Sequence, residues 1–145
     1  MTSVPIESVV ADANVLLSAV TGKAALRVII EFAVDVHVAE FNVAEVFEYL
    51  PFMAKKYRIE EELLLLQWKL IPLKVHPQSD YQSLLEQATM DLAKRDPEDA
   101  HPLALARQLE MPLWSNDRDL VGHGVECFPT ARLLATLQKH QGSPT

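Results

Sequence analysis

Hydrophobic residues show two kinds of spacing, one typical of short strands and the other typical of helices, and segments of the two kinds follow one another along the chain. Runs rich in β-branched or apolar residues predict strands at residues 6–12, 34–40, 70–75, 111–114 and 125–128. Apolar side chains repeated every three or four positions predict helices at residues 15–20, 24–34, 40–50, 53–68, 79–95, 97–110 and 130–140. Strands that alternate with helices in this way favour an α/β fold, a three-layer α/β/α sandwich around a mainly parallel sheet.

Two prolines modify this pattern. Pro51 is expected to end or kink the helix that begins near residue 40, because proline lacks a backbone N–H and its ring clashes with the preceding turn. The residues after Pro51 resume helical spacing, so we expect a helical hairpin. Pro72 lies within the third predicted strand and favours an edge position, since proline cannot donate to a neighbouring strand.

The length and composition indicate one globular domain. A chain of 145 residues is short of the roughly 250 residues beyond which chains divide into domains, so we assign residues 1–140 to the domain and 141–145 to a flexible tail. Hydrophobic residues make up 49% and charged residues 23%, which excludes an intrinsically disordered protein. No apolar run approaches the roughly 18 residues of a membrane span, and the acidic start does not resemble an export signal. We expect a cytoplasmic protein with no membrane contact.

The net charge limits how this chain can contact nucleic acid. A formal net charge of -7 argues against binding over a broad basic face, because that affinity comes largely from neutralising phosphates. Nucleic acid is not excluded, since a bound metal ion reverses the charge of one pocket. The positions of the acidic side chains therefore matter more than their total.

Four acidic side chains are expected near one edge of the sheet. Asp12 ends the first predicted strand, and Asp117 follows the fourth. Glu45 lies in the first turns of the helix after the second strand, and Asp99 lies at the start of the helix that leads into the fourth strand. Ligands of open α/β sheets bind beyond the carboxyl ends of the strands. We therefore expect these four carboxylates to converge there.

Carboxylates gathered at one place predict a cation. They repel one another and raise each other's pKa unless a cation joins them. Oxygen ligands alone suit Mg²⁺ or Mn²⁺, which keep several waters and bridge to phosphate oxygens. The five histidines are scattered and Cys127 stands alone, a pattern that argues against zinc. The predicted chemistry is metal-assisted hydrolysis of phosphodiesters.

Four segments resemble, in order, the motifs of the PIN-domain family. They are VVADANVLLSAV, NVAEVFEYL, RDPEDAHPLALA and PLWSNDRDL, and the likeness spans nearly the whole chain. By this resemblance Asp12, Glu45, Asp99 and Asp117 match the metal-binding acids. The resemblance also implies a metal-dependent ribonuclease, often the VapC-like toxin of a toxin–antitoxin pair. RNA is then the expected substrate, and a cognate antitoxin is a candidate partner.

Five further residues are candidates for the same site. The resemblance matches Asn14 to the small polar partner of the first acid and Ser115 to the hydroxyl before the last one. Asp96 has the position of a helix N-cap before a proline, and the alternative is that it replaces Asp99 as the third acid. Asp119 is expected to cap the short turn that follows it, with metal binding as its alternative. Arg118 is a candidate phosphate contact.

Two other functions stay open at this point. A haloacid dehalogenase-like phosphatase also uses an aspartate at a strand end, but the second aspartate of its D-x-D motif is missing after Asp12. A catalytically silent PIN-fold module that binds RNA or a partner would keep the fold, although the presence of all four acids disfavours it. The apolar segments 47–52 and 63–68 favour a homodimer.

Overall fold

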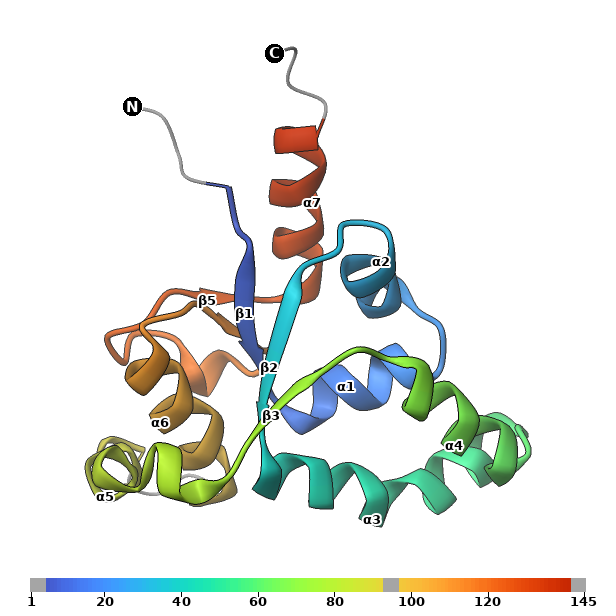
Figure 1. Ribbon diagram of the computed structural model, residues 1–145, viewed down its shortest axis with the longest axis horizontal. Coiled ribbons are helices and arrows are strands. Elements are labelled where there is room, and N and C mark those ends of the chain that lie inside the picture. The colour runs from blue at the N-terminus through green and yellow to red at the C-terminus, as the bar shows by residue number, and fades with distance from the viewer. Residues whose placement is uncertain (1–4, 93–96, 142–145) are drawn as a thin grey trace.

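The computed structural model of the chain describes residues 5–92 and 97–141, which form a sheet between two layers of helices (Figure 1). The strands are β1 Ser8–Ala11, β2 Asp35–Ala39, β3 Lys74–His76, β4 Leu113–Trp114 and β5 Cys127–Phe128. They lie in the order β3-β2-β1-β4-β5, and every neighbouring pair is parallel. The predicted α/β/α fold is confirmed, and so is the edge position of the third strand. This strand begins at Lys74, however, so Pro72 precedes it and does not lie within it as predicted.

The helices cover both faces of the sheet. They are α1 Ala13–Val20, α2 Ala24–Ile30, α3 Glu40–Tyr57, α4 Glu61–Leu70, α5 Gln82–Asp91, α6 Ala100–Leu109 and α7 Thr130–Gln141. α5 and α6 pack on one face, and the other helices pack on the opposite face. Of the helices in the described ranges, none alone is long and apolar enough to cross a membrane, and α1 with α2 meets that test only as a pair bent by 91°.

The central strand β1 is buried on both sides. Val9 and Ala11 belong to the core beneath α1 and α7, whereas Val10 belongs to the core beneath α6. All three side chains have 0% exposure. A parallel strand between two helical layers needs apolar residues at successive positions, which explains why this segment is continuously apolar and not alternating.

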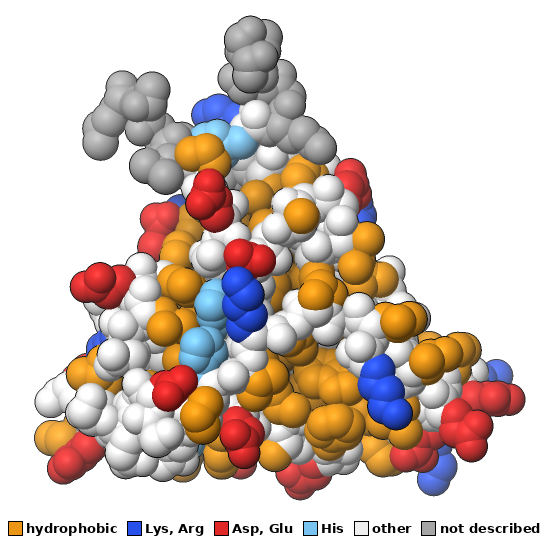
Figure 2. Space-filling model, in the orientation of Figure 1, with side chains coloured by type: hydrophobic (Ala, Val, Ile, Leu, Met, Phe, Trp, Pro, Cys, Tyr) orange, Lys and Arg blue, Asp and Glu red, His pale blue; other side chains and the backbone are white. Residues whose placement is uncertain are grey.

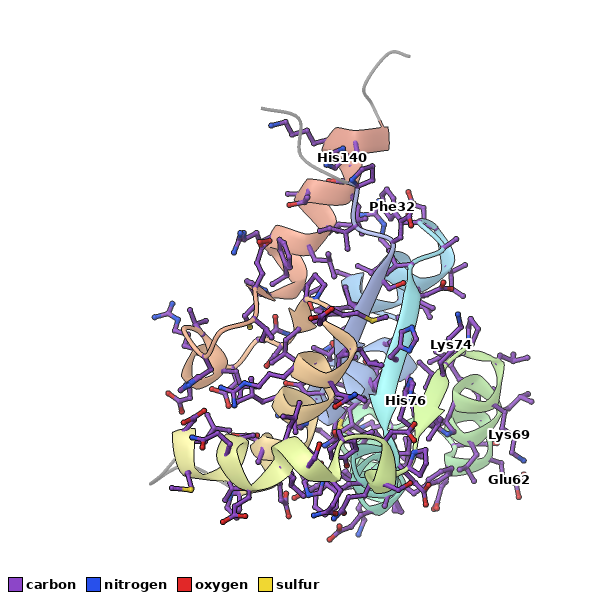
Figure 3. The ribbon with its side chains drawn as sticks, turned by 60° about the vertical axis from the view of Figure 1, so that its left-hand side comes forward. Phe32, Glu62, Lys69, Lys74, His76 and His140 are labelled. Atoms are coloured by element: carbon purple, nitrogen blue, oxygen red, sulfur yellow. The ribbon has the colours of Figure 1, made fainter. Side chains whose placement is uncertain are left out.

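The edge strand β3 carries polar side chains on one face. Lys74 and His76, both labelled in Figure 3, belong to this strand. Lys74 Nζ lies 3.4 Å from Asp35 Oδ2, and His76 Nε2 lies 2.8 Å from His37 Nδ1. Charged and polar groups of this kind protect an edge strand from pairing with another chain.

The carboxyl ends of β1, β2 and β4 meet at one edge of the sheet. α1 begins directly after β1, with Asp12 as its N-cap, and α3 begins directly after β2 at Glu40. The loop after β4 runs through Ser115 and Asp117. The short connections bring segments that are far apart in the sequence to the edge where α/β proteins bind ligands.

Of the two outcomes expected at Pro51, an end or a kink of the helix, the end is wrong, because helix α3 continues through this residue. Val46 and Leu50 before the proline and Ala54 after it are buried, and they hold one continuous helix against the core. This tertiary packing outweighs the backbone hydrogen bond that proline removes. The helix ends at Tyr57 with Arg58 as its C-cap, where φ is 55°, and α4 begins at Glu61. The two helices form the predicted hairpin, but its turn lies at residues 58–60 and not directly after Pro51.

Helices α2, α5 and α6 are shorter than their apolar patterns predict. α5 begins at Gln82, since Gln78–Asp80 forms a separate 3₁₀ turn. α2 ends earlier, because the chain turns through Ala33 with φ of 52° before it enters β2. α6 begins at Ala100, since Pro97–Asp99 forms a 3₁₀ turn. Asp99 therefore stands directly before α6 instead of inside its first turn. The predicted N-cap Asp96 lies outside the described residues.

We expect Pro51→Ala to raise the free energy of unfolding by about 1–2 kcal/mol, because alanine restores a backbone N–H at an exposed helical position. The gain stays below the full propensity difference of about 3 kcal/mol, since proline also restricts the unfolded chain. Pro51→Gly is the control and should gain about 1 kcal/mol less than alanine. Urea unfolding measures both, and a destabilised alanine variant would contradict this explanation of α3.

Candidate active site

Asp12 is a buried carboxylate at the junction of β1 and α1. Its side chain is 7% exposed. Oδ1 accepts a hydrogen bond from the Val15 backbone N–H at 2.9 Å, and Oδ2 accepts one from the Ser115 hydroxyl at 2.5 Å. Burial raises the pKa of Asp12, and the nearby Asp117 carboxylate adds to this, whereas the two hydrogen bonds oppose it. The ionised form of Asp12 is therefore costly in the folded chain.

A series of hydrogen bonds connects Asp12 to the loop after β4. Ser115 is 1% exposed, and its hydroxyl accepts from the Asp117 backbone N–H at 3.0 Å while it donates to Asp12. Asp117 Oδ1 accepts from the Asp119 backbone N–H at 2.9 Å and caps the 3₁₀ turn Arg118–Leu120. Asp119, expected to cap the turn that follows it, lies inside this 3₁₀ turn, and Asp117 is the residue that caps it.

A cavity of about 270 Å³ opens beside Asp12. Its wall includes Asp12, Asn14 on α1, Glu45 on α3 and Asp99 before α6. Asp117 is not part of the wall, but it is linked to Asp12 through Ser115 and its charge acts on Asp12. Three of the four candidate acids, together with Asn14, thus share one cavity at the expected edge of the sheet.

Asn42 is a site residue that the sequence did not suggest. It is 2% exposed, lines the same cavity, and donates from Nδ2 to Glu45 Oε1 at 2.6 Å. Its Oδ1 is buried without a hydrogen-bond partner. An unpaired buried acceptor costs about 1–3 kcal/mol, so this amide is held in place at the expense of stability. The three-residue spacing between Asn42 and Glu45, which puts both on one helix face, is the signal that could have identified it.

Helix α3 presents one face to the cavity. Asn42, Glu45, Tyr49 and Phe52 are spaced three or four residues apart, and all of them line it. Tyr49 and Phe52 are nevertheless 48% and 62% exposed. In the sequence these two aromatic residues belong to an apolar segment expected at a subunit interface. Their spacing from Glu45 is the signal that connects them to the acidic cavity instead.

Two other candidates among the described residues lie away from the cavity wall. Arg118 is exposed in the 3₁₀ turn after Asp117, and Asp119 is half-buried in the same turn. Asp96 lies outside the described residues. Glu98, which the motif comparison did not single out, lines the cavity beside Asp99.

The cavity offers oxygen donors from carboxylates and amides, and this donor set suits Mg²⁺ or Mn²⁺. Within residues 5–92 and 97–141, no three His, Cys, Asp or Glu side chains lie close enough together to hold a metal ion. Mg²⁺ commonly binds through one or two carboxylates and keeps several waters. The buried charge of Asp12 and the unpaired oxygen of Asn42 are the two features that a hydrated cation would satisfy.

Asp12 is expected to make the metal-free protein less stable as the pH rises. Burial puts the pKa of Asp12 in the folded chain above its value in the unfolded chain. At pH values between these two pKa values, the folded chain binds more protons than the unfolded chain. The free energy of unfolding therefore falls as the pH rises from about 4 until it passes the folded-state pKa. Asp12→Asn should remove this decline and raise the melting temperature at about pH 7, because an amide retains the cap to Val15 and a bond with Ser115.

Thermal melts between about pH 4 and pH 8 measure this effect. Glu126→Gln is the control, since Glu126 is exposed and should leave the slope of stability against pH unchanged. Equal slopes in the parent and in Asp12→Asn would show that the Asp12 charge is not destabilising.

Comparisons with known proteins agree with this geometry. The chain is similar to PAE2754 from Pyrobaculum aerophilum (TM-score 0.68, 20% identity, over 92% of this chain and 90% of that chain). It is also similar to VapBC2 from Rickettsia felis bound to a promoter DNA fragment (TM-score 0.66, 11% identity, over 84% of this chain and 98% of that chain). A third similar structure is a toxin–antitoxin complex from Klebsiella pneumoniae (TM-score 0.58, 18% identity, over 80% of this chain and 92% of that chain). At these identities the likeness establishes the fold.

The sequence itself gives the stronger assignment. No curated protein matches the chain significantly. The sequence model of the PIN domain, however, matches residues 10–138, from the end of β1 to the last turns of α7. This match contains Asp12, Glu45, Asp99 and Asp117 in their order along the chain. The chain therefore belongs to the PIN-domain family.

Proposed function

We propose that the chain is a Mg²⁺- or Mn²⁺-dependent endoribonuclease whose metal-binding and catalytic acids are Asp12, Glu45, Asp99 and Asp117. The observation that carries the proposal is the buried, destabilised carboxylate of Asp12 in a cavity that Glu45 and Asp99 also line. PIN-domain proteins are generally nucleases, and this supports nuclease activity. The similarity to toxin–antitoxin structures supports the further proposal that the nuclease is a toxin.

The residues of the chain have distinct tasks in this proposal. Asp12, Glu45 and Asp99 would bind a hydrated cation from the cavity wall, in part through its waters, and Asp117, which is linked to Asp12 through Ser115, would add negative charge. The Ser115 hydroxyl holds one oxygen of Asp12 and leaves the carboxylate oriented toward α1 and the cavity. When bound, Mg²⁺ or Mn²⁺ supplies a Lewis acid and a water of lowered pKa for attack on phosphorus.

Polar residues around the acids complete the proposed site. Asn42 orients Glu45 through Nδ2, and its unpaired Oδ1 would accept a hydrogen bond from a water of a hydrated cation. Asn14 on the cavity wall would contact the same waters. Asp96, which lies outside the described residues, and Asp119 stay candidates for supporting roles. Arg118 is exposed in the adjacent turn and contacts a substrate phosphate.

The proposal includes two protein partners. α4 exposes Leu63, Leu66 and Leu70, and in Figure 2 hydrophobic side chains gather over the lower right of the molecule, the region of α4 in Figure 1. Exposed apolar side chains of this kind favour a homodimer or a cognate antitoxin as occupants. We propose both partners for a cytoplasmic ribonuclease. The alternative, a silent module that binds RNA or a partner, is decided by the following experiment.

Asp12→Asn, Glu45→Gln and Asp99→Ser should each bind Mn²⁺ more weakly and lose about 100-fold or more of Mn²⁺-dependent cleavage of a structured RNA, because each removes a charged metal ligand. Calorimetry measures Mn²⁺ binding, and a gel assay measures cleavage. Glu48→Gln, on the exposed side of α3, is the matched control for Glu45→Gln and should retain both. Mn²⁺ binding without cleavage by the parent chain would favour the silent module.

Serine variants of Asp96 and Asp99 distinguish which of the two residues is the third acid of the site. Asp99→Ser alone should lose cleavage if Asp99 is the third acid. Parental activity in Asp99→Ser together with lost activity in Asp96→Ser would give that role to Asp96.

Asn42→Ala should lower the affinity for Mn²⁺ by about 10- to 100-fold, because Glu45 loses the amide that orients it. Stability should change by less than about 1 kcal/mol, since the variant also removes an unpaired buried oxygen. Calorimetry and thermal melts of the metal-free protein measure the two effects separately. An unchanged Mn²⁺ affinity would give Asn42 a purely structural role.

A further inference from the structure

Two exposed aromatic side chains stand at the acidic cavity without an assigned task. Tyr49 and Phe52 line it together with Asp12 and Glu45, yet roughly half or more of each side chain is exposed. Exposed aromatic rings leave apolar area in water, and a grouping of them commonly marks a contact surface. Because both rings follow Glu45 on the same face of α3, they extend the acidic site along the helix.

Phe52 also belongs to a second hollow. A groove of about 550 Å³ is lined by Phe52 together with Pro51, Lys55 and Ile59. Phe52 is thus shared by the acidic cavity and by a groove that contains one cationic and one acidic side chain, Lys55 and Glu61. Lys56 and Arg58 follow Lys55 in the sequence and add positive charge at the end of α3. The helix therefore presents acids, aromatic rings and cations in succession.

We propose that Tyr49 and Phe52 form a base-stacking subsite for an unpaired nucleobase next to the phosphate at the acidic cavity. This inference rests on the ribonuclease function proposed above and names the part of the substrate that α3 recognises. An aromatic ring binds any base through its face, and a nearby cation attracts the adjoining phosphate. Lys55, on the far side of Phe52 from the acids, supplies that cation.

The position of the rings favours RNA over a permanent subunit interface. A second copy of the chain seated on Tyr49 and Phe52 would cover the cavity that contains Asp12 and exclude both cation and substrate. α4 offers a separate apolar surface for a second copy in Leu63, Leu66 and Leu70. A flat base stacked on the rings leaves the cavity open, and its phosphate continues toward the acids. A subunit interface at these rings is therefore the competing outcome of the experiment.

The experiment uses Tyr49→Ala, Phe52→Ala and the full chain with Mn²⁺. Steady-state cleavage of a single-stranded RNA oligonucleotide is measured with the parent substrate and with versions that carry one abasic nucleotide at successive positions. Tyr49→Phe and Phe52→Trp keep an aromatic face. Phe47→Ala is the matched control, since Phe47 lies on the same helix, is 47% exposed, and packs edge-on against Trp68 away from the cavity.

Each alanine variant should raise KM about 5- to 100-fold, with little change in kcat or Mn²⁺ affinity. Tyr49→Phe, Phe52→Trp and Phe47→Ala should behave as the parent. One abasic position should weaken the parent to the same extent and should have no additional effect on Phe52→Ala, because two changes that remove one contact are not additive.

An unchanged KM in the alanine variants would overturn the subsite. So would light scattering that shows a dimer of the parent dissociating in these variants in parallel with their loss of activity, because this result assigns the rings to a subunit interface. Independent, additive effects of the abasic nucleotide and Phe52→Ala would also exclude direct stacking. A parent chain that binds Mn²⁺ but cleaves no RNA would overturn the proposed ribonuclease and the subsite together, whereas an active parent with unaffected variants would overturn the subsite alone.

Discussion

The buried carboxylate of Asp12 is the constraint on which the candidate site depends. β1 lies between β2 and β4 at the centre of the sheet, so the residue at its carboxyl end is enclosed by the elements that follow all three strands. The Val15 amide and the Ser115 hydroxyl fix both oxygens of this side chain. They do not neutralise its charge, and burial raises its pKa. A bound cation would neutralise this charge.

Polar groups at this edge of the sheet destabilise the fold, and apolar packing in the rest of the sheet offsets their cost. Asp12 is costly when ionised, and Asn42 keeps an unpaired buried oxygen. The strands beside them are almost wholly buried between two helical layers, and this apolar packing tolerates a few unfavourable groups. Polar groups held in unfavourable positions by a rigid core are typical of binding sites, because the ligand later satisfies them.

Helix α3 organises much of the proposed chemistry. Its start holds Asn42 and Glu45 at the cavity, its middle adds Tyr49 and Phe52, and its end is basic. The sequence arranges these groups at helical spacing, but they act together only because the helix remains continuous through Pro51. A break there would have turned Phe52 and the cations away from the acids.

The sequence by itself determined the alternation of strands and helices, the edge position after Pro72, the placement of Asp12 at a strand end and the family, because these follow from local periodicity and short motifs. Tertiary structure alone decided the rest. Packing of buried residues on both sides of Pro51 keeps α3 continuous. The path of the loop after β4 places Asp117 directly before the 3₁₀ turn, which it caps. Burial leaves the Oδ1 atom of Asn42, beside Glu45, without a hydrogen-bond partner. Burial and long-range contacts depend on segments that are distant in the sequence, so local sequence patterns do not predict them.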